Sequence, residues 1–292
     1  MRDFENTNPI VITVYFLAVS GVCMFSMHPI LLALSLFGAV AYSLVRGGLR
    51  SPAFHALMLL IFLIGALINP LVSSAGATRL FFINDSPVTL EAIAYGIAAS
   101  AAVVGVIYWF RSYTQIMTSD KLLYTFGKLS PRLSLVLSMA LRYVALLSEE
   151  RRKIKQIQIS LGLYSDGNII DRARGEIRVF SVLVTFALEN GIITADSMAA
   201  RGYGSGKRTH FAIFKFGAWD IFALLLTLTL FALTLGCLLC GALDFEFYPT
   251  LSPINTGLWS VIGYISYGML VTLPIFAEME ERARWKYLRS KI

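Results

Sequence analysis

Long hydrophobic runs without any Asp, Glu, Lys or Arg recur along the chain, and they predict membrane-spanning helices. The runs are 10–45, 53–78, 92–110, 221–243 and 247–277. About 20 helical residues cross the hydrocarbon core of a bilayer, so the first run is too long for one span. His28-Pro29 lies near its middle, and proline lacks the amide that a continuous helix needs. We therefore predict two helices there, 10–27 and 29–46, and six spans in all.

The last run also contains prolines, in Tyr248-Pro249 and Ser252-Pro253, so we expect its helix to begin near Gly257. The composition agrees with a membrane protein. Of the 292 residues, 57% are hydrophobic and 15% are charged, whereas a soluble domain carries about 25% charged residues. Soluble globular enzymes, disordered chains and disulfide scaffolds are thereby excluded. The predicted fold class is an all-α polytopic membrane protein, with about six transmembrane helices and a cytoplasmic α-helical region between spans four and five.

The basic residues are distributed unevenly, and their placement predicts the orientation in the membrane. With the N-terminus in the cytoplasm, 24 of the 25 Lys and Arg side chains lie inside and only Arg79 lies outside. Cytoplasmic loops carry an excess of Lys and Arg, so we predict that both termini are cytoplasmic. The predicted organisation is helices one to four over 1–110, a cytoplasmic region over 111–218, and helices five and six with a basic tail over 219–292.

Two apolar stretches within residues 111–218 are too short or too charged to be spans. The stretch 133–147 has Arg142 near its centre, and a charged side chain at mid-bilayer costs at least about 2.5 kcal/mol. The stretch 179–200 contains Glu189 and Asp196. We predict that both form helices that lie under, or partly within, the inner face of the membrane.

Small residues in the second of these helices leave two interpretations open. Ala187, Gly191, Ala195 and Ala199 recur every four positions on one helix face, which favours close approach of another helix backbone. Either the helix packs on its neighbour for stability alone, or it is a rigid arm that presents Arg201 to a partner.

Sites for nucleotides, metals or catalysis find little support in the sequence. Gly202–Lys207 lacks the spacing and the preceding strand of a Walker A motif. Cys237 and Cys240 have metal or redox spacing but lie in an unbroken apolar run. Apart from Glu91 at an outer end, the spans carry no charged residue of the kind that ion-coupled carriers use, and they contain no nucleophile–base pair. We expect no catalytic residue, no metal site and no cofactor bound by this chain.

Several ordered stretches resemble those of a known family. The most specific is Ala195-Asp-Ser-Met-Ala-Ala-Arg-Gly-Tyr-Gly204, followed by Arg208-Thr209. The others are Thr89-Leu-Glu91, Ser134–Tyr143, and Glu149-Glu150-Arg151-Arg152 with Gln156. Together they resemble the transmembrane T component of energy-coupling factor (ECF) transporters, the family that includes the cobalt-transport membrane subunit.

This resemblance implies partners and site residues. In the family, two cytoplasmic helices end in Ala-Arg-Gly motifs, and each Arg binds in a groove of one of two ATP-binding-cassette (ABC) ATPases, which form a homo- or heterodimer. A small membrane-embedded S component binds the substrate. The second motif corresponds to Ala200-Arg201-Gly202. The residues expected to support the coupling region are Arg142, Glu149, Arg152, Gln156, Asp196, Tyr203 and Arg208.

At the place of the first motif, the chain departs from the family pattern. Between Gln156 and Leu163 it reads Ser160-Leu161-Gly162, so Leu161 stands where Arg is expected. A literal Ala173-Arg174-Gly175 follows beyond the loop 165–168, and we interpret it as a coincidental match. Either Lys155 and neighbouring basic residues replace the missing Arg, or one ATPase docks through apolar packing.

The function that the resemblance implies is that of a non-enzymatic subunit in the plasma membrane of a prokaryote. It would couple ATP hydrolysis in the two ATPases to import of a vitamin or a transition-metal ion. ATP and Mg²⁺ are then bound by partner subunits, and no nucleic acid is expected as a partner. The alternatives are a self-contained secondary transporter, an intramembrane enzyme, and a membrane scaffold of unrelated ancestry. Polar chemistry within the spans would favour the first two, and it is nearly absent.

Overall fold

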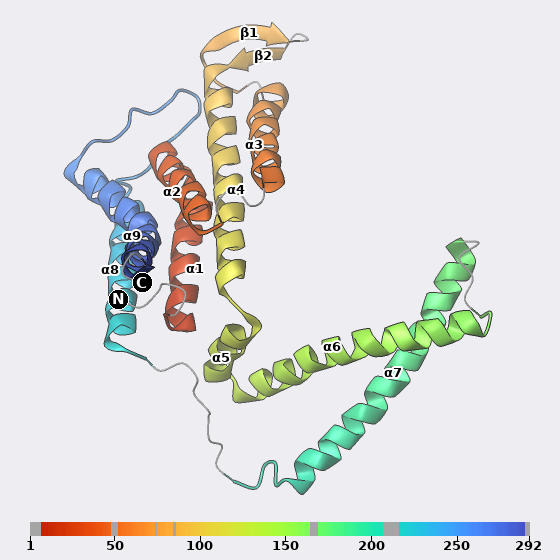
Figure 1. Cartoon of the computed structure of the whole chain (residues 1–292). Coiled ribbons are helices and arrows are strands. Elements are labelled where there is room, and N and C mark those ends of the chain that lie inside the picture. The colour runs from red at the N-terminus through yellow and green to blue at the C-terminus, as the bar shows by residue number, and fades with distance from the viewer. Residues whose placement is uncertain are drawn as a thin grey trace. The chain divides into compact units, whose positions relative to one another are not determined.

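The computed structural model describes residues 7–47, 52–73, 75–83, 86–163, 169–206 and 216–289. The chain divides into two compact units. The first, the membrane unit, comprises Met1–Thr118 and Phe214–Ile292, and the second, the arm unit, comprises Ser119–Ile213. Each unit has its own set of helices (Figure 1).

The membrane unit contains one helix for each of the six predicted spans. They are α1 (Pro9–Phe25), α2 (Pro29–Gly47), α3 (Pro52–Val72), α4 (Leu90–Ile116), α8 (Ala218–Leu239) and α9 (Leu258–Arg289). The first two are separate helices with a break at residues 26–28, and α9 begins directly after Gly257. The helices are therefore interrupted at the prolines at positions 29 and 253, as predicted. Helix α4 ends six residues beyond the end of the expected span.

Six helices in the described residues are long and apolar enough to cross a membrane. They are α2, α3, α4, α8, α9 and α7 (Ile169–Ala200), the helix that we predict to be cytoplasmic. This set differs from the six predicted spans, because it includes α7 and leaves out α1. Helix α1 has only 17 residues, but such a helix is still about 26 Å long, close to the thickness of the hydrocarbon core. The all-α membrane class is confirmed, whereas the side of the membrane on which α7 lies stays a prediction.

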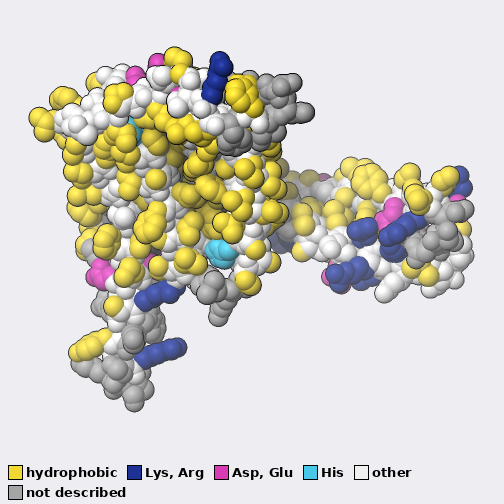
Figure 2. All heavy atoms as spheres, turned by 90° about the horizontal axis from the view of Figure 1, so that it is seen from above, with side chains coloured by type: hydrophobic (Ala, Val, Ile, Leu, Met, Phe, Trp, Pro, Cys, Tyr) yellow, Lys and Arg dark blue, Asp and Glu magenta, His cyan; other side chains and the backbone are white. Residues whose placement is uncertain are grey.

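Aromatic residues with a polar atom form the centre of the membrane unit. The Trp109 indole is fully buried and donates to the Ser35 hydroxyl at 3.0 Å, which ties α4 to α2. The hydroxyl of Tyr15 in α1 donates to the carbonyl of Leu270 in α9 at 3.1 Å. Buried hydroxyl and indole groups need such partners, so these bonds specify which helix faces meet. Many exposed side chains of these helices are large and hydrophobic, as contact with lipid favours, and Figure 2 shows such side chains gathered on one face of the unit.

A short hairpin precedes α4, and the hydrophobic pattern did not predict it. Strands β1 (Arg79–Ile83) and β2 (Ser86–Thr89) pair antiparallel, with Arg79 opposite Thr89. Glu91 lies at the hairpin's base and is buried; its carboxylate accepts from the Thr78 amide at 3.2 Å and from the Thr78 hydroxyl at 2.5 Å. Glu91, at the start of α4, therefore anchors a loop.

The arm unit consists of α5 (Ser119–Leu129), α6 (Pro131–Ser160) and α7. Helix α6 is twice as long as the apolar stretch that predicted it, because the charged residues after it continue the helix. Within them the Lys153 ammonium lies 2.8 Å from Glu150 and 3.4 Å from Glu149, at helical spacings of three and four. Hydrogen bonding to Glu150, and then to Glu149, raises the pKa of Lys153, so its charge is retained to higher pH. Helix α7 likewise begins at Ile169, ten residues before the predicted stretch.

Candidate functional site

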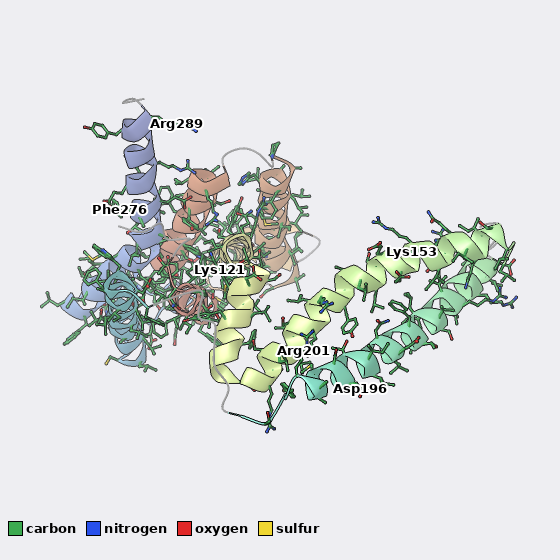
Figure 3. The ribbon with its side chains drawn as sticks, turned by 60° about the horizontal axis from the view of Figure 1, so that its bottom comes forward. Lys121, Lys153, Asp196, Arg201, Phe276 and Arg289 are labelled. Atoms are coloured by element: carbon green, nitrogen blue, oxygen red, sulfur yellow. The ribbon has the colours of Figure 1, made fainter. Side chains whose placement is uncertain are left out.

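Helices α6 and α7 pack against each other, and polar contacts join them at two places. Near one end of the pair, the Tyr143 hydroxyl of α6 lies 3.0 Å from the Thr194 hydroxyl of α7. Near the other end, Glu176 of α7 binds two basic residues of α6. Figure 3 shows both helices with Lys153 on α6 and with Asp196 and Arg201 at the end of α7. The two helices thus form a fixed pair whose C-termini carry the two expected motifs.

The end of α7 is defined by a Schellman cap, a pattern of two backbone bonds around a glycine. The Tyr203 amide donates to the Met198 carbonyl at 3.0 Å, and the Gly202 amide donates to the Ala199 carbonyl at 3.0 Å. Gly202 has φ +77°, a conformation that favours glycine. Arg201 is the last residue before this turn, and its side chain is exposed. The α7 tip (Ala200–Tyr203) therefore holds Arg201 in a defined position at the end of a long helix.

The end of α6 has the same backbone geometry. The Leu163 amide donates to the Gln158 carbonyl at 2.9 Å, and the Gly162 amide donates to the Ile159 carbonyl at 3.0 Å. Gly162 has φ +69°. In this α6 tip (Ser160–Leu163), Leu161 occupies the backbone position that Arg201 occupies in the α7 tip. The structure thus makes Ser160-Leu161-Gly162 the geometric counterpart of Ala200-Arg201-Gly202.

The cap itself is not particular to these two helices. Helix α8 ends in the same way: the Ala242 amide donates to the Cys237 carbonyl at 3.1 Å, and Gly241 has φ +71°. A Schellman cap satisfies the last carbonyls of a helix and is common. What distinguishes the two tips is therefore the side chain that each presents before its glycine.

The literal Ala173-Arg174-Gly175 ends no helix. It lies in the second turn of α7, where Gly175 is buried and Arg174 pairs with Asp171 at 3.7 Å. An Arg within a helix, paired along the same helix face, does not extend beyond a helix end. This tripeptide therefore lacks the geometry that the other two share.

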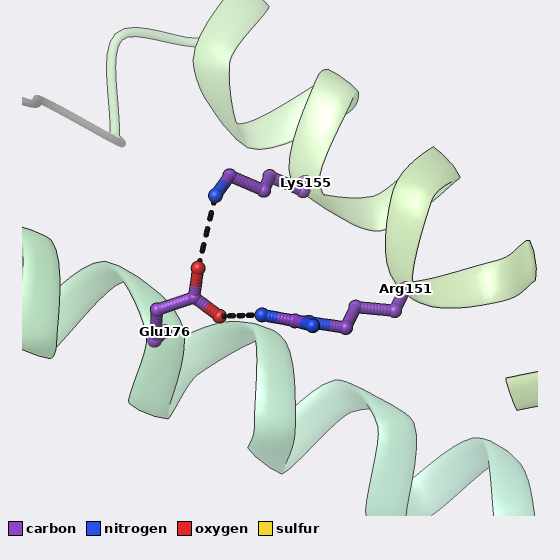
Figure 4. Close-up of polar contacts among 3 residues, drawn as sticks. All are labelled: Arg151, Lys155 and Glu176. Atoms are coloured by element: carbon purple, nitrogen blue, oxygen red, sulfur yellow. Dashed lines mark hydrogen bonds and ion pairs between the residues drawn. The ribbon is translucent and has the colours of Figure 1, made fainter. Parts of the chain in front are cut away.

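A three-residue ion cluster holds α6 against the first half of α7 (Figure 4). The Glu176 carboxylate lies 2.8 Å from the Arg151 guanidinium and 2.9 Å from the Lys155 ammonium. Sequence reasoning noted the basic run but did not identify Glu176, because its two partners lie more than twenty residues away. The available signal was a Glu near the start of a predicted helix that follows a basic run on the preceding helix.

Among the residues expected to support the region, several lie exposed along the two helices. These are Arg142, Glu149, Arg152, Gln156 and Asp196. Tyr203 is half exposed and belongs to the α7 tip. Arg208 lies outside the described residues. The buried polar residue of α6 is Gln158, two positions beyond the expected Gln156.

At Gly191, the small residues of α7 leave open space and make no close contact with another helix backbone. A side chain added at Gly191 would meet no atom within 4 Å. Instead Gly191 and Ala195 line a hollow of about 320 Å³ between the helices, together with Met139 and Tyr143 of α6. The small residues thus border open space beside the α7 tip.

We expect Glu176→Gln to loosen the pairing of α6 with α7. The substitution leaves the Arg151 and Lys155 charges without their shared partner, and a partly exposed ion network contributes about 1 kcal/mol. Hydrogen exchange of the amides near the α6 tip should accelerate by about fivefold. Glu149→Gln is the matched control, because in the part of the chain that the structure describes Glu149 pairs with Lys153 of its own helix. Equal exchange in both variants would contradict a role for the cluster in pairing the helices.

The comparisons with known proteins bear on this site. No family model matches the chain. It is 36% identical over 109 residues to the energy-coupling factor transporter transmembrane protein EcfT of Lactobacillus helveticus, covering 37% of this chain and 38% of that protein. It is 31% identical over 93 residues to EcfT 1 of Listeria monocytogenes, covering 31% and 35%. It is 36% identical over 90 residues to EcfT of Leuconostoc gelidum, covering 30% and 34%.

The chain therefore matches less than two-fifths of the length of these relatives. Within that share, similarity at 31–36% identity to three proteins of one name confirms the resemblance that the sequence motifs indicated. Over about a third of its length, this all-α membrane protein is similar to EcfT, the transmembrane protein of energy-coupling factor transporters.

Proposed function

We propose that this chain is the T component of an ECF-type ABC importer. It passes the motion of two ATPase subunits to a small S component that binds a vitamin or a transition-metal ion. ATP and Mg²⁺ are bound by the ATPases. The observation that carries the proposal is the similarity to EcfT, together with the exposed Arg201 on a rigid helix end.

The chemistry of the α7 tip suits contact with a protein groove. A guanidinium has five donors in a planar fork that can bind carboxylates or helix-end carbonyls. The Schellman cap directs the chain away after Gly202, so Arg201 is presented by the helix end itself. Since α7 has 32 residues and is about 48 Å long, a displacement at this tip is transmitted along the helix as rigid-body motion.

The distribution of charge supports a cytoplasmic position for α7. If α7 crossed the membrane, Arg201 and the basic tail 282–291 would change sides. Lys and Arg concentrate on the cytoplasmic side, and that arrangement would lose the strong asymmetry of the six-span topology. We therefore propose that the arm unit and both termini are cytoplasmic and that the protein lies in the plasma membrane.

Polar groups within the membrane unit have structural partners, which favours a scaffold over a carrier. Glu91 anchors the Thr78 loop. Asp220 is buried and accepts from the Asn8 amide at 3.1 Å and from the Gly217 amide at 2.8 Å. These carboxylates are held by backbone amides rather than directed into a pathway for ions or substrate.

Affinity purification of the tagged chain from its native membrane, in mild detergent, tests the proposal. We expect two ABC ATPase subunits and a small, very hydrophobic protein to purify with it, and ATP to drive uptake when the complex is reconstituted in liposomes. A chain that purifies alone and transports a substrate without ATPases would overturn the proposal in favour of a self-contained transporter.

A further inference from the structure

We propose that the α6 tip is an apolar plug that docks in a hydrophobic pocket of one ATPase subunit. This pocket differs in chemistry from the polar groove that receives Arg201 on the other subunit. The inference rests on the proposed function, because it assumes two ATPase partners. According to this inference, the α6 tip contacts an apolar surface and the α7 tip contacts a polar one.

The geometric equivalence of the tips is the first observation. Leu161 and Arg201 each precede a glycine with positive φ, and the same two backbone bonds close each turn. The α6 tip therefore presents a side chain in the same manner as the α7 tip. Its chemistry is opposite, because leucine has no donor and no charge.

Other exposed hydrophobic side chains flank Leu161 along the chain. Leu161 is 66% exposed and Leu163 is 52% exposed, and on the last turn of α6 Ile157 and Ile159 are 59% and 51% exposed. Single exposed apolar residues are ordinary, but a cluster at the end of a charged helix marks an interaction surface. An apolar pocket in a protein is the surface that complements it.

Two of the basic residues near the α6 tip, Lys155 and Arg178, have partners within the helix pair. Lys155, the replacement that the sequence suggests, lies 2.9 Å from Glu176. Arg178 of α7 donates to the Leu163 carbonyl at 3.0 Å. Both cations are directed into the helix pair instead of beyond the tip. Of the two alternatives that the sequence left open, the contacts favour apolar packing.

Two identical grooves cannot suit both tips. A groove that binds a guanidinium offers carboxylate or carbonyl oxygens, and these would be left buried without a donor against leucine. An apolar pocket would in turn strip Arg201 of water without pairing its charge. The two ATPase subunits must therefore present different surfaces, and the tips determine which subunit docks at which helix.

Subunit-resolved binding to the full chain, co-expressed with its own ATPases, tests this assignment. Leu161→Asp should reduce the amount of one ATPase subunit that purifies with the chain by at least about tenfold, and Arg201→Ala should reduce the other. Val144→Asp is the matched control, because Val144 is also 66% exposed but lies about 26 Å along α6 from the tip. It should retain both ATPases.

Crosslinking avoids any effect of a charged substitution on folding. With Cys240 replaced by serine, since it is the exposed native cysteine, Leu161→Cys and Arg201→Cys should crosslink to different subunits. Crosslinking of both positions to one kind of subunit would overturn the proposal. So would crosslinking of position 161 to lipid alone, or full retention of both ATPases by Leu161→Asp.

Two further outcomes separate this inference from the proposed function. Arg172→Ala combined with Arg174→Ala removes two exposed cations from the first turns of α7, the helix that follows the α6 tip along the chain, and should leave both subunits bound. Loss of a subunit from that variant would show that cations, and not Leu161, make the contact. A wild-type chain that binds no ATPase at all would overturn the proposed function itself. If the wild-type chain binds both ATPases and Leu161→Asp binds them equally well, only the proposed docking of the α6 tip is overturned.

Discussion

Arg201→Ala is expected to abolish ATP-driven uptake while the chain still inserts in the membrane. The side chain is exposed at the C-terminus of α7 and contributes little to packing within the arm unit. Its loss removes the fork of donors that the partner groove binds and leaves acceptors in that groove unpaired. Uptake of labelled substrate by reconstituted complexes, together with the amount of chain in the membrane fraction, measures the two effects separately.

Two further variants make this expectation specific. Arg201→Lys keeps the charge but not the planar fork, so it should restore uptake only in part. Arg174→Ala is the matched control: it removes an Arg from the other Ala-Arg-Gly on the same helix, one that ends no helix. We expect that variant to transport normally. Normal uptake by Arg201→Ala, or an equal loss in Arg174→Ala, would refute the coupling role of the α7 tip.

Gly96→Leu is expected to disrupt the membrane unit by separating α3 from α4. A Cβ atom at Gly96 would lie 2.7 Å from the Ala66 carbonyl oxygen and 3.2 Å from the Asn69 Cβ. The first of these neighbours is backbone, so the whole helix must shift. The shift also breaks the bond from the Asn69 side-chain amide to the Ala92 carbonyl, which is 2.8 Å long. Overpacking and this lost bond together should cost about 3 kcal/mol.

Thermal unfolding in detergent, followed by intrinsic fluorescence, measures the effect of Gly96→Leu. Gly21→Leu is the matched control, because it makes the same substitution within helix α1 at a position where an added Cβ meets no atom within 4 Å. We expect the control to unfold at or slightly above the wild-type temperature, since leucine favours helix more than glycine does. If both variants lost equal stability, the close contact of α3 with α4 would not be its source.

The spans and the helix interruptions could be predicted because they follow from local properties. Whether a segment enters a bilayer depends on its own hydrophobicity and length, so the charge-free runs coincide with α1 to α4, α8 and α9. Proline acts on its own backbone, so the breaks before Pro29 and after Pro253 were predictable. The hairpin 79–89 was not, because its strands depend on pairing with each other and on the Glu91 anchor.

The candidate site could be predicted in part for the same reason. The sequence alone indicated that Ala200-Arg201-Gly202 lies at the end of a helix with small residues on one face. It also showed that Leu161 stands where the family pattern has Arg. It could not show that Ser160-Leu161-Gly162 and Ala200-Arg201-Gly202 have the same backbone geometry. Nor could it show that Ala173-Arg174-Gly175 lacks this geometry. That distinction depends on which amides bond to which carbonyls at a helix end.

By itself, then, the sequence determined the class of the protein, its charge-free apolar runs and the location of its charged region, because hydrophobicity, charge and proline act on the segment that contains them. Only the tertiary structure decided that Lys155 is paired with Glu176, that Arg178 binds the Leu163 carbonyl, and that Gly191 borders a hollow. These facts concern residues brought together from two helices, and no local pattern records which side chains will meet across the space between them.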